Sequence, residues 1–287
     1  MHFVLNLDKP RGITSQDAVT KAKRLFGARK AGHAGTLDPL ATGVLLICLN
    51  EATKIAGYLS DLEKEYTATL KLGERTDTFD SEGRIIEKGV IDPFLLTEAD
   101  VQRAIEGFRG RQKQVPPMFS AIKKDGRPLY ELARKGIEVK REPRTVFIHS
   151  LDIEGFEPPF LKLRTACSKG TYIRSLADDI GRALGTGAHI VELRRTRVGG
   201  FGAGDSADLS SARTSPKAVK TIDEALAHLD EVVLGKEDFQ RASHGSPVML
   251  KDGMTPRHVR LKDPEGRLFA IGFVEELKIK IERILHL

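Results

Sequence analysis

Apolar residues alternate with polar ones at several places along the chain, and a period of two is typical of strands. In the stretch EYTATLKLG, one face of an extended segment carries Tyr66, Ala68, Leu70 and Leu72. The continuous apolar run at 43–49 predicts a strand that is buried. Further strands are expected at 2–7, 145–156, 161–167 and 189–199.

Apolar residues spaced three and four apart predict helices, and three of these begin with the spacing of a capping box. In this motif a threonine caps the first turn and an acid three residues later caps the threonine in return. The pairs are Thr14 with Asp17, Thr97 with Asp100 and Thr221 with Glu224. We expect helices at 15–26, 51–62, 97–108, 129–135, 173–184 and 221–229.

Strands and helices follow one another without a regular βαβ alternation, and no Gly-x-Gly-x-x-Gly motif occurs. This order indicates an α+β fold built on a mixed, mainly antiparallel sheet with flanking helices, and it argues against a dinucleotide-binding fold. From residue 232 onward the apolar segments are short and β-like. We therefore expect a first domain at 1–230 and a small β-rich domain at 231–287.

Charge is concentrated in one segment. The 287 residues carry a formal net charge of +6, with a pI of about 9.2. Residues 103–144 hold 12 Lys or Arg and 5 Asp or Glu, a net charge of +7, so the rest of the chain is close to neutral. With its two prolines at 116–117 and a small apolar patch, this segment is expected to be an insertion from the main sheet. It forms either a solvated basic face or a surface that binds the phosphates of a nucleic acid.

Composition also narrows the class of protein. No apolar run approaches the roughly 20 residues needed to span a bilayer, and the first residues lack the basic and apolar regions of a signal peptide. Cys48 and Cys167 lie in apolar, strand-like runs and form no metal-binding pattern, so we expect buried, reduced thiols. A cytoplasmic protein is expected.

The most unusual polar segment is AGHAGTLDPLATG, which precedes the buried strand at 43–49. Pro39 biases Asp38 towards an extended or turn conformation, and glycines on both sides permit tight turns or close approach of a ligand. An ordinary Asp-Pro turn is one interpretation. A catalytic carboxylate held at the mouth of a rigid strand is the other.

This segment resembles the signature of the TruB family of tRNA pseudouridine synthases. Five other stretches are similar to that family in the same order, and together they cover about 4–199. They are LDKPRGITS, KEYTATLKLGERTDTFDSEG, VPPMFSAIKKDGRPLYELARKGIEVKR, CSKGTYIRSLADDIG and HIVELRRTRVG. The resemblance implies the pseudouridine-synthase sheet, followed by a small PUA-like RNA-binding domain. It also implies an isomerase that needs no cofactor or metal and that acts on uridine 55 in the T loop of tRNA.

The resemblance assigns roles to individual residues. Asp38 is the essential carboxylate in contact with the sugar or base. Because burial opposes ionisation, a cation is expected beside it, and Arg174 matches the family arginine that fills this role. Tyr66 matches an active-site tyrosine that contacts the base and assists the proton step at C5. Tyr172 and Leu193 match walls of the uracil pocket.

Three further positions match family residues around the active site. Lys9, next to Pro10, supports the active-site loop, and Asp80 joins a polar network around the target loop. His33 is expected to fill the space left when bases are everted from the RNA. An acid or base role for His33 is the alternative.

The basic segment resembles the insertion that clamps the T-stem loop in standalone bacterial enzymes of the family. Met118 and Phe119 are expected to brace it. The cations expected to meet phosphates are Lys123, Lys124, Arg127, Arg134, Lys140, Arg141 and Arg144. Relatives that act with guide RNAs are understood to lack this insertion, so a monomeric enzyme that recognises tRNA without a guide is expected.

Three other functions stay open from the sequence. They are an RNA-binding protein without catalysis, a guide-dependent synthase, and a glycosidase with two carboxylates, for which Asp80 is the only candidate for the second acid that we can name.

Overall fold

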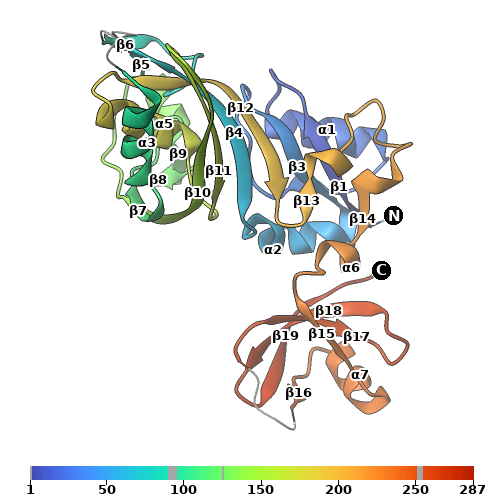
Figure 1. Ribbon diagram of the computed structural model, residues 1–287. Helices are drawn as coiled ribbons and strands as arrows, with labels where there is room; N and C mark the ends of the chain where they lie inside the picture. The colour runs from blue at the N-terminus through green and yellow to red at the C-terminus, as the bar shows by residue number, and fades with distance from the viewer. Residues whose placement is uncertain (1, 90–95, 125, 251–254) are drawn as a thin grey trace.

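The computed structural model of the protein describes residues 2–89, 96–124, 126–250 and 255–287. Figure 1 shows a large twisted sheet flanked by helices and, below it, a small sheet built from the end of the chain. This α+β arrangement, with a separate β-rich part at the end, confirms the fold class expected from the sequence. No helix in the described ranges is long and apolar enough to cross a membrane.

The large sheet has ten strands, and its main path runs β14-β1-β3-β12-β4-β11-β10-β7, with β2 paired to β3 and β13 to β12. The strands are β1 (Phe3–Lys9), β2 (Ala31–His33), β3 (Thr42–Leu49), β4 (Lys64–Leu72), β7 (Gly110–Gln114), β10 (Arg144–Glu157), β11 (Phe160–Cys167), β12 (Ala188–Val198), β13 (Phe201–Gly202) and β14 (Val219–Thr221). Every pairing is antiparallel except that of β12 with β3, which is parallel at Arg194–Thr42 and Arg195–Gly43. This parallel seam joins the two halves of the sheet.

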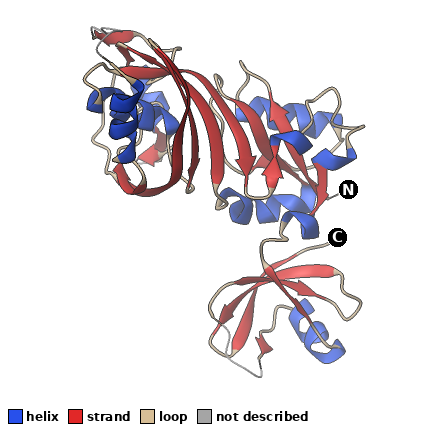
Figure 2. Cartoon of the chain, in the orientation of Figure 1, coloured by secondary structure: helices blue, strands red, loops and turns tan. Residues whose placement is uncertain are grey.

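Helices flank both halves of the sheet (Figure 2). They are α1 (Ser15–Leu25), the 3₁₀ helix η1 (Asn50–Ile55), α2 (Ala56–Ser60), α3 (Glu98–Glu106), α4 (Leu129–Arg134), α5 (Ile173–Ala183) and α6 (Ile222–Ala225), with short 3₁₀ turns η2 (Ala203–Asp205) and η3 (Pro216–Ala218). All three predicted capping boxes are present. Two predicted helices differ: 51–62 begins as the 3₁₀ turn η1, and 221–229 is only one turn long as a helix.

The alternating pattern of β4 holds over the whole strand, where every second side chain is buried. Its buried face packs with β11, β12 and the inner faces of α3 and α5 in the main hydrophobic core. Each large aliphatic side chain buried in this way contributes about 1.5–3 kcal/mol to stability. The central strands are therefore a rigid support for the loops at their ends.

The segment expected to be an insertion begins later than the sequence indicated. Its first part lies in α3, whose Val101 and Ile105 are fully buried in the main core, and in β7, which pairs with β10 as an edge strand. Of the described residues in this segment, 115–124 and 126–143 leave the sheet; they include α4 and the strands β8 (Lys123–Lys124) and β9 (Arg127–Pro128). The high charge of 103–114 concealed an edge strand, because such a strand has one solvated face and one unpaired rim.

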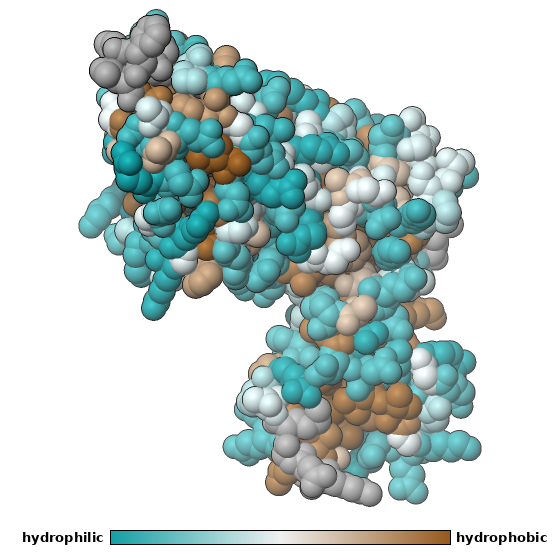
Figure 3. Space-filling view, viewed as in Figure 1, coloured by the Kyte–Doolittle hydropathy of each residue, from teal (hydrophilic) through white to brown (hydrophobic). Residues whose placement is uncertain are grey.

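The small sheet has the order β15-β17-β18-β19-β16. Its strands are β15 (Asp230–Val233), β16 (Val248–Met249), β17 (His258–Lys262), β18 (Leu268–Glu275) and β19 (Lys278–Ile284). The expectation of β segments alone was incomplete, because α7 (Lys236–Ser243) packs Ala242 into this small core. On the face seen in Figure 3, apolar residues gather over this part of the chain, whereas the upper part is mostly hydrophilic.

The two sheets are fastened to each other by apolar and polar contacts. Leu268 and Ile271 of the small sheet belong to the same buried cluster as Val44 of β3. Tyr58 donates a hydrogen bond of 2.7 Å to Glu282, and Arg260 forms an ion pair of 2.6 Å with Asp223 near α6. A last pair of strands, β5 (Glu74–Thr76) and β6 (Ile85–Lys88), forms a hairpin next to α5.

Candidate active site

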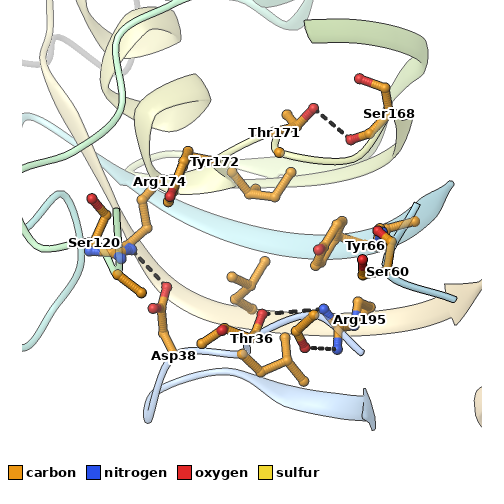
Figure 4. A pocket seen from close by; sticks show the side chains of 17 residues that line it. Thr36, Asp38, Ser60, Tyr66, Ser120, Ser168, Thr171, Tyr172, Arg174 and Arg195 are labelled. Atoms are coloured by element: carbon orange, nitrogen blue, oxygen red, sulfur yellow. Dashed lines mark hydrogen bonds and ion pairs between the residues drawn. The ribbon is translucent and has the colours of Figure 1, made fainter. Parts of the chain in front are cut away.

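Asp38 lies in the loop between β2 and β3, at the wall of a cavity of about 270 Å³. Its side chain is 35 % exposed, and its Oδ2 atom lies 2.8 Å from Nε of Arg174. Figure 4 shows this ion pair at one end of the cavity, with Tyr66 and Arg195 at the other end. The remaining walls come from the start of α5, the centre of β12 and the segment after β7. The cavity therefore lies where both halves of the sheet and the insertion meet.

Arg174 is the side chain that connects these parts. It stands in the first turn of α5 and is only 5 % exposed. Its Nη1 atom donates to the Thr78 carbonyl at 2.9 Å and lies 3.4 Å from Oδ2 of Asp80, while Nη2 donates to the Phe119 carbonyl at 2.8 Å. A buried guanidinium is tolerated when its charge is paired and its Nη donors are hydrogen-bonded in this way.

Two side chains, Ser15 and Lys9, hold the backbone around Asp38 in place through hydrogen bonds. The Ser15 hydroxyl donates to the Leu37 carbonyl at 2.9 Å and accepts from the Leu37 amide at 2.8 Å. Lys9, fully buried, donates to the Pro10, Ile13 and Pro39 carbonyls at 2.8, 2.9 and 3.4 Å. Burial lowers the pKa of Lys9 to about 8. The structure thus places Lys9 under the loop and outside the cavity.

Three predicted residues line the cavity with apolar or aromatic surface: Tyr66, Tyr172 and Leu193. Tyr66 is on the buried face of β4, and this burial raises the pKa of its phenol. Tyr172 is fixed just before α5 because its amide donates to Gln114 at 2.8 Å and its carbonyl accepts from Gln114 at 3.0 Å. Burial raises the pKa of Tyr172 as well.

Asp80 and His33 do not reach the cavity wall. Asp80 is buried beside Arg174, and its Oδ1 accepts from the Thr78 hydroxyl at 2.6 Å and from the Glu82 amide at 3.1 Å. Asp80 therefore belongs to a network of buried hydrogen bonds and does not line the cavity. His33 ends β2, burial lowers its pKa, and its Nδ1 atom has no hydrogen-bond partner among the described residues.

Sequence reasoning missed several polar residues of the cavity, among them Lys64, Ser120 and Arg195. Lys64 and Arg195 are buried cations that stand two residues from Tyr66 and Leu193, on the same strand faces. The sequence does contain a signal for both residues. Each is a charged residue at a position that the strand periodicity assigns to the buried core. Lys64 donates to the carbonyls of Ser60 and Leu62, and burial lowers its pKa to about 8.

The predicted phosphate-binding cations lie on the segment 115–143 and at the start of β10. All of them are exposed except Arg141, which donates to the Pro116 carbonyl at 3.1 Å. Met118 and Phe119 are half-buried and line a groove of about 730 Å³ between this segment and the β5–β6 hairpin.

Cys48 and Cys167 are free, buried thiols, as expected, and burial raises their pKa values to about 12 and about 11. Within the described ranges, no three His, Cys, Asp or Glu side chains are grouped so that they could hold a metal ion.

Comparison with known proteins gives matches over nearly the whole chain. A family model described as the N-terminal domain of TruB family pseudouridylate synthase matches residues 23–173, and one described as the tRNA pseudouridylate synthase B C-terminal domain matches 174–238. A protein of Dechloromonas aromatica named tRNA pseudouridine synthase B is 48% identical over 94% of this chain and 90% of its own length. The protein of that name from Pseudomonas aeruginosa is 42% identical over 95% of this chain and 92% of its own.

Solved structures show the same fold at lower identity. A Cbf5–Nop10–Gar1 complex contains a chain that is 27% identical, with a TM-score of 0.76 over 98% of this chain and 84% of that one. An archaeal box H/ACA sRNP Nop10–Cbf5 complex contains a chain that is 25% identical, with a TM-score of 0.73 over 98% of this chain and 85% of that one.

Proposed function

Because the chain belongs to the TruB family and is a tRNA pseudouridine synthase, we propose that it converts the uridine at position 55 in the T loop into pseudouridine. The observation that carries the proposal is the ion pair of Asp38 with Arg174 at the wall of a cavity whose other walls are Tyr66, Tyr172 and Leu193. A carboxylate paired with a buried cation, beside an aromatic and apolar pocket, suits a reaction on a flat uncharged base and its sugar.

The reaction breaks the bond between N1 of uracil and C1′ of ribose and forms a bond between C5 and C1′. N1 gains a proton and C5 loses one, so the product is an isomer of the substrate. In our proposal Asp38 contacts the sugar or base at the reacting carbon, and Arg174 holds its carboxylate in place. Tyr66 assists loss of the C5 proton, and Tyr172 and Leu193 hold the base while it turns.

A base inside a folded T loop must leave its stack before it can enter this cavity, which costs a few kcal/mol. We propose that His33 packs into the space that the everted bases leave. His33 lies at the end of β2, next to the loop 34–41 that carries Asp38, which we call the catalytic loop. In this role the shape of the His33 side chain matters and its charge does not. Burial lowers the pKa of His33 and favours the neutral imidazole, which agrees with such a role.

We propose that the exposed cations of 115–144 hold the phosphates of the T-stem and that the enzyme acts in the cytoplasm as a monomer without a guide RNA. The 42% and 48% identity to tRNA pseudouridine synthase B, against 27% to the chain in the Cbf5 complex, supports the standalone function. The basic excursion next to the cavity supports binding of RNA by this chain alone.

The test is release of tritium from a T-stem-loop RNA transcribed with tritium at C5 of uridine. Wild type, Asp38→Asn and the matched control Asp205→Asn, which changes an exposed acid that does not line the cavity, are assayed without guide or cofactor. We expect release by wild type and by Asp205→Asn, and none by Asp38→Asn. Tight RNA binding without release by wild type would refute a standalone synthase and favour a guide-dependent enzyme or an RNA-binding protein.

A further inference from the structure

Arg195 is the largest fully buried side chain of the protein, with 1 % of its surface exposed. It lies on β12 at the parallel seam with β3, where its backbone pairs with Gly43. A Cβ atom at Gly43 would lie 2.2 Å from the Arg195 carbonyl oxygen, and the φ of Gly43 is +99°, so only glycine fits this crossing. The backbone that follows the catalytic loop therefore packs directly against the backbone of Arg195 at Gly43.

The guanidinium group of Arg195 also donates hydrogen bonds to backbone carbonyls of the catalytic loop and of β3. Its Nε donates to the Val44 carbonyl at 2.7 Å, Nη2 to the Gly35 carbonyl at 3.1 Å and Nη1 to the Thr36 carbonyl at 3.3 Å. Figure 4 shows the two bonds to the loop. The planar guanidinium of Arg195 therefore fixes the backbone at Gly35 and Thr36, shortly before Asp38. It also fixes the strand β3 that follows the loop.

No carboxylate lies within ion-pair distance of Arg195 in the described part of the chain, and all three of its hydrogen bonds go to neutral carbonyls. Burying an unpaired charge is costly, and such groups concentrate at functional sites. The Arg195 side chain also lines the cavity together with Tyr66 (Figure 4). Arg195 and Tyr66 are also paired directly across the neighbouring strands β12 and β4. The charge of Arg195 opposes the rise that burial causes in the pKa of the Tyr66 phenol.

We propose that Arg195 is a positioning residue of the reaction, which holds the Asp38 loop and the Tyr66 phenol in one fixed geometry on two sides of the base. Ser15 and Lys9 hold the loop from the other side, but neither faces the cavity. Arg195 is therefore the group that couples both catalytic side chains. This inference rests on the proposed function, because it assigns Asp38 and Tyr66 their roles.

The first test compares Arg195→Lys with the control Arg197→Lys, which changes a half-buried arginine two residues along the same strand. Lysine keeps the charge but has one ammonium group in place of a planar fork, so it does not hold three separate carbonyls. We expect kcat for tritium release to fall about 100-fold in Arg195→Lys, the usual cost of a misplacement near 1 Å, with KM within threefold of wild type. Arg197→Lys keeps both parameters.

The second test does not depend on activity. The chain has four tyrosines, so 3-fluorotyrosine labelling gives four ¹⁹F resonances, and Tyr66→Phe assigns one of them. We expect the Tyr66 resonance to shift in Arg195→Lys and to stay in place in Arg197→Lys. If Arg195→Lys keeps the wild-type resonance, or keeps the wild-type kcat, the inference is wrong. If wild type releases no tritium while the resonance shifts as expected, the proposed function fails and the coupling of Arg195 to Tyr66 stands.

Discussion

Replacing Arg174 by methionine removes one guanidinium and leaves a side chain of similar length. The change removes a guanidinium that contacts four groups. Asp38 and Asp80 lose their cation, and the carbonyls of Thr78 and Phe119 lose a donor. The last two belong to the turn after β5 and to the insertion, so one link between the turn and the insertion is lost as well.

The magnitude follows from burial. Arg174 and Asp80 have side chains that are 5 % and 6 % exposed, and removing one partner of such a buried pair costs about 3–5 kcal/mol of unfolding free energy. Loss of a preorganised donor at a reacting group costs about 10²–10³ in kcat. Arg174→Lys restores the charge but not the four-way geometry, so we expect it to recover part of the stability and less than a tenth of the lost activity.

The assay measures two quantities on the same preparations. Chemical denaturation gives the unfolding free energy, and single-turnover release of tritium from the T-stem-loop gives the rate of the chemical step. Arg182→Met serves as control, since Arg182 lies on the same helix with a side chain that is 60 % exposed. If Arg174→Met keeps wild-type stability to within 1 kcal/mol and its rate to within threefold, the four-way contact does not support the site as we have argued.

Three further predictions concern other parts of the molecule. Burial lowers the pKa of Lys64 to about 8 from about 10.5, so between these pH values the unfolded chain binds more protons and folded stability rises with pH. The unfolding free energy of wild type should therefore gain up to about 3 kcal/mol over that of Lys64→Met between pH 8 and 10.5, and a constant difference would contradict this. In the insertion, Lys123→Ala with Lys124→Ala should reduce the salt dependence of RNA binding by about 1–2 in slope and leave kcat at saturating RNA unchanged; an unchanged slope in a salt titration would remove these lysines from the RNA surface. In the core, Ile105→Ala on α3 should cost about 2–5 kcal/mol in denaturant unfolding, whereas a loss below 1 kcal/mol would mean that this helix is not part of the main core.

Local pattern was sufficient for most of the elements. Alternation predicted β4 with its buried face, and three threonine–acid pairs predicted where α1, α3 and α6 begin. Both signals depend on residues within a few positions of each other, so neither needs the rest of the chain. The edge strand β7 was missed because a solvated strand with alternating charge has no apolar face of its own to reveal it.

Within the candidate site, the sequence determined which residues to consider: the motif around Asp38, the arginine of the first turn of α5 and the tyrosine of β4. The family resemblance already paired Arg174 with Asp38. Only the tertiary structure decided that Arg174 also meets Asp80 and the Phe119 carbonyl, and that Arg195 holds the catalytic loop. These groups come from segments up to 160 positions apart. They come together where β12 and β3 pair in parallel. A contact between distant segments produces no periodic pattern in the sequence of either segment, so the sequence alone does not reveal it.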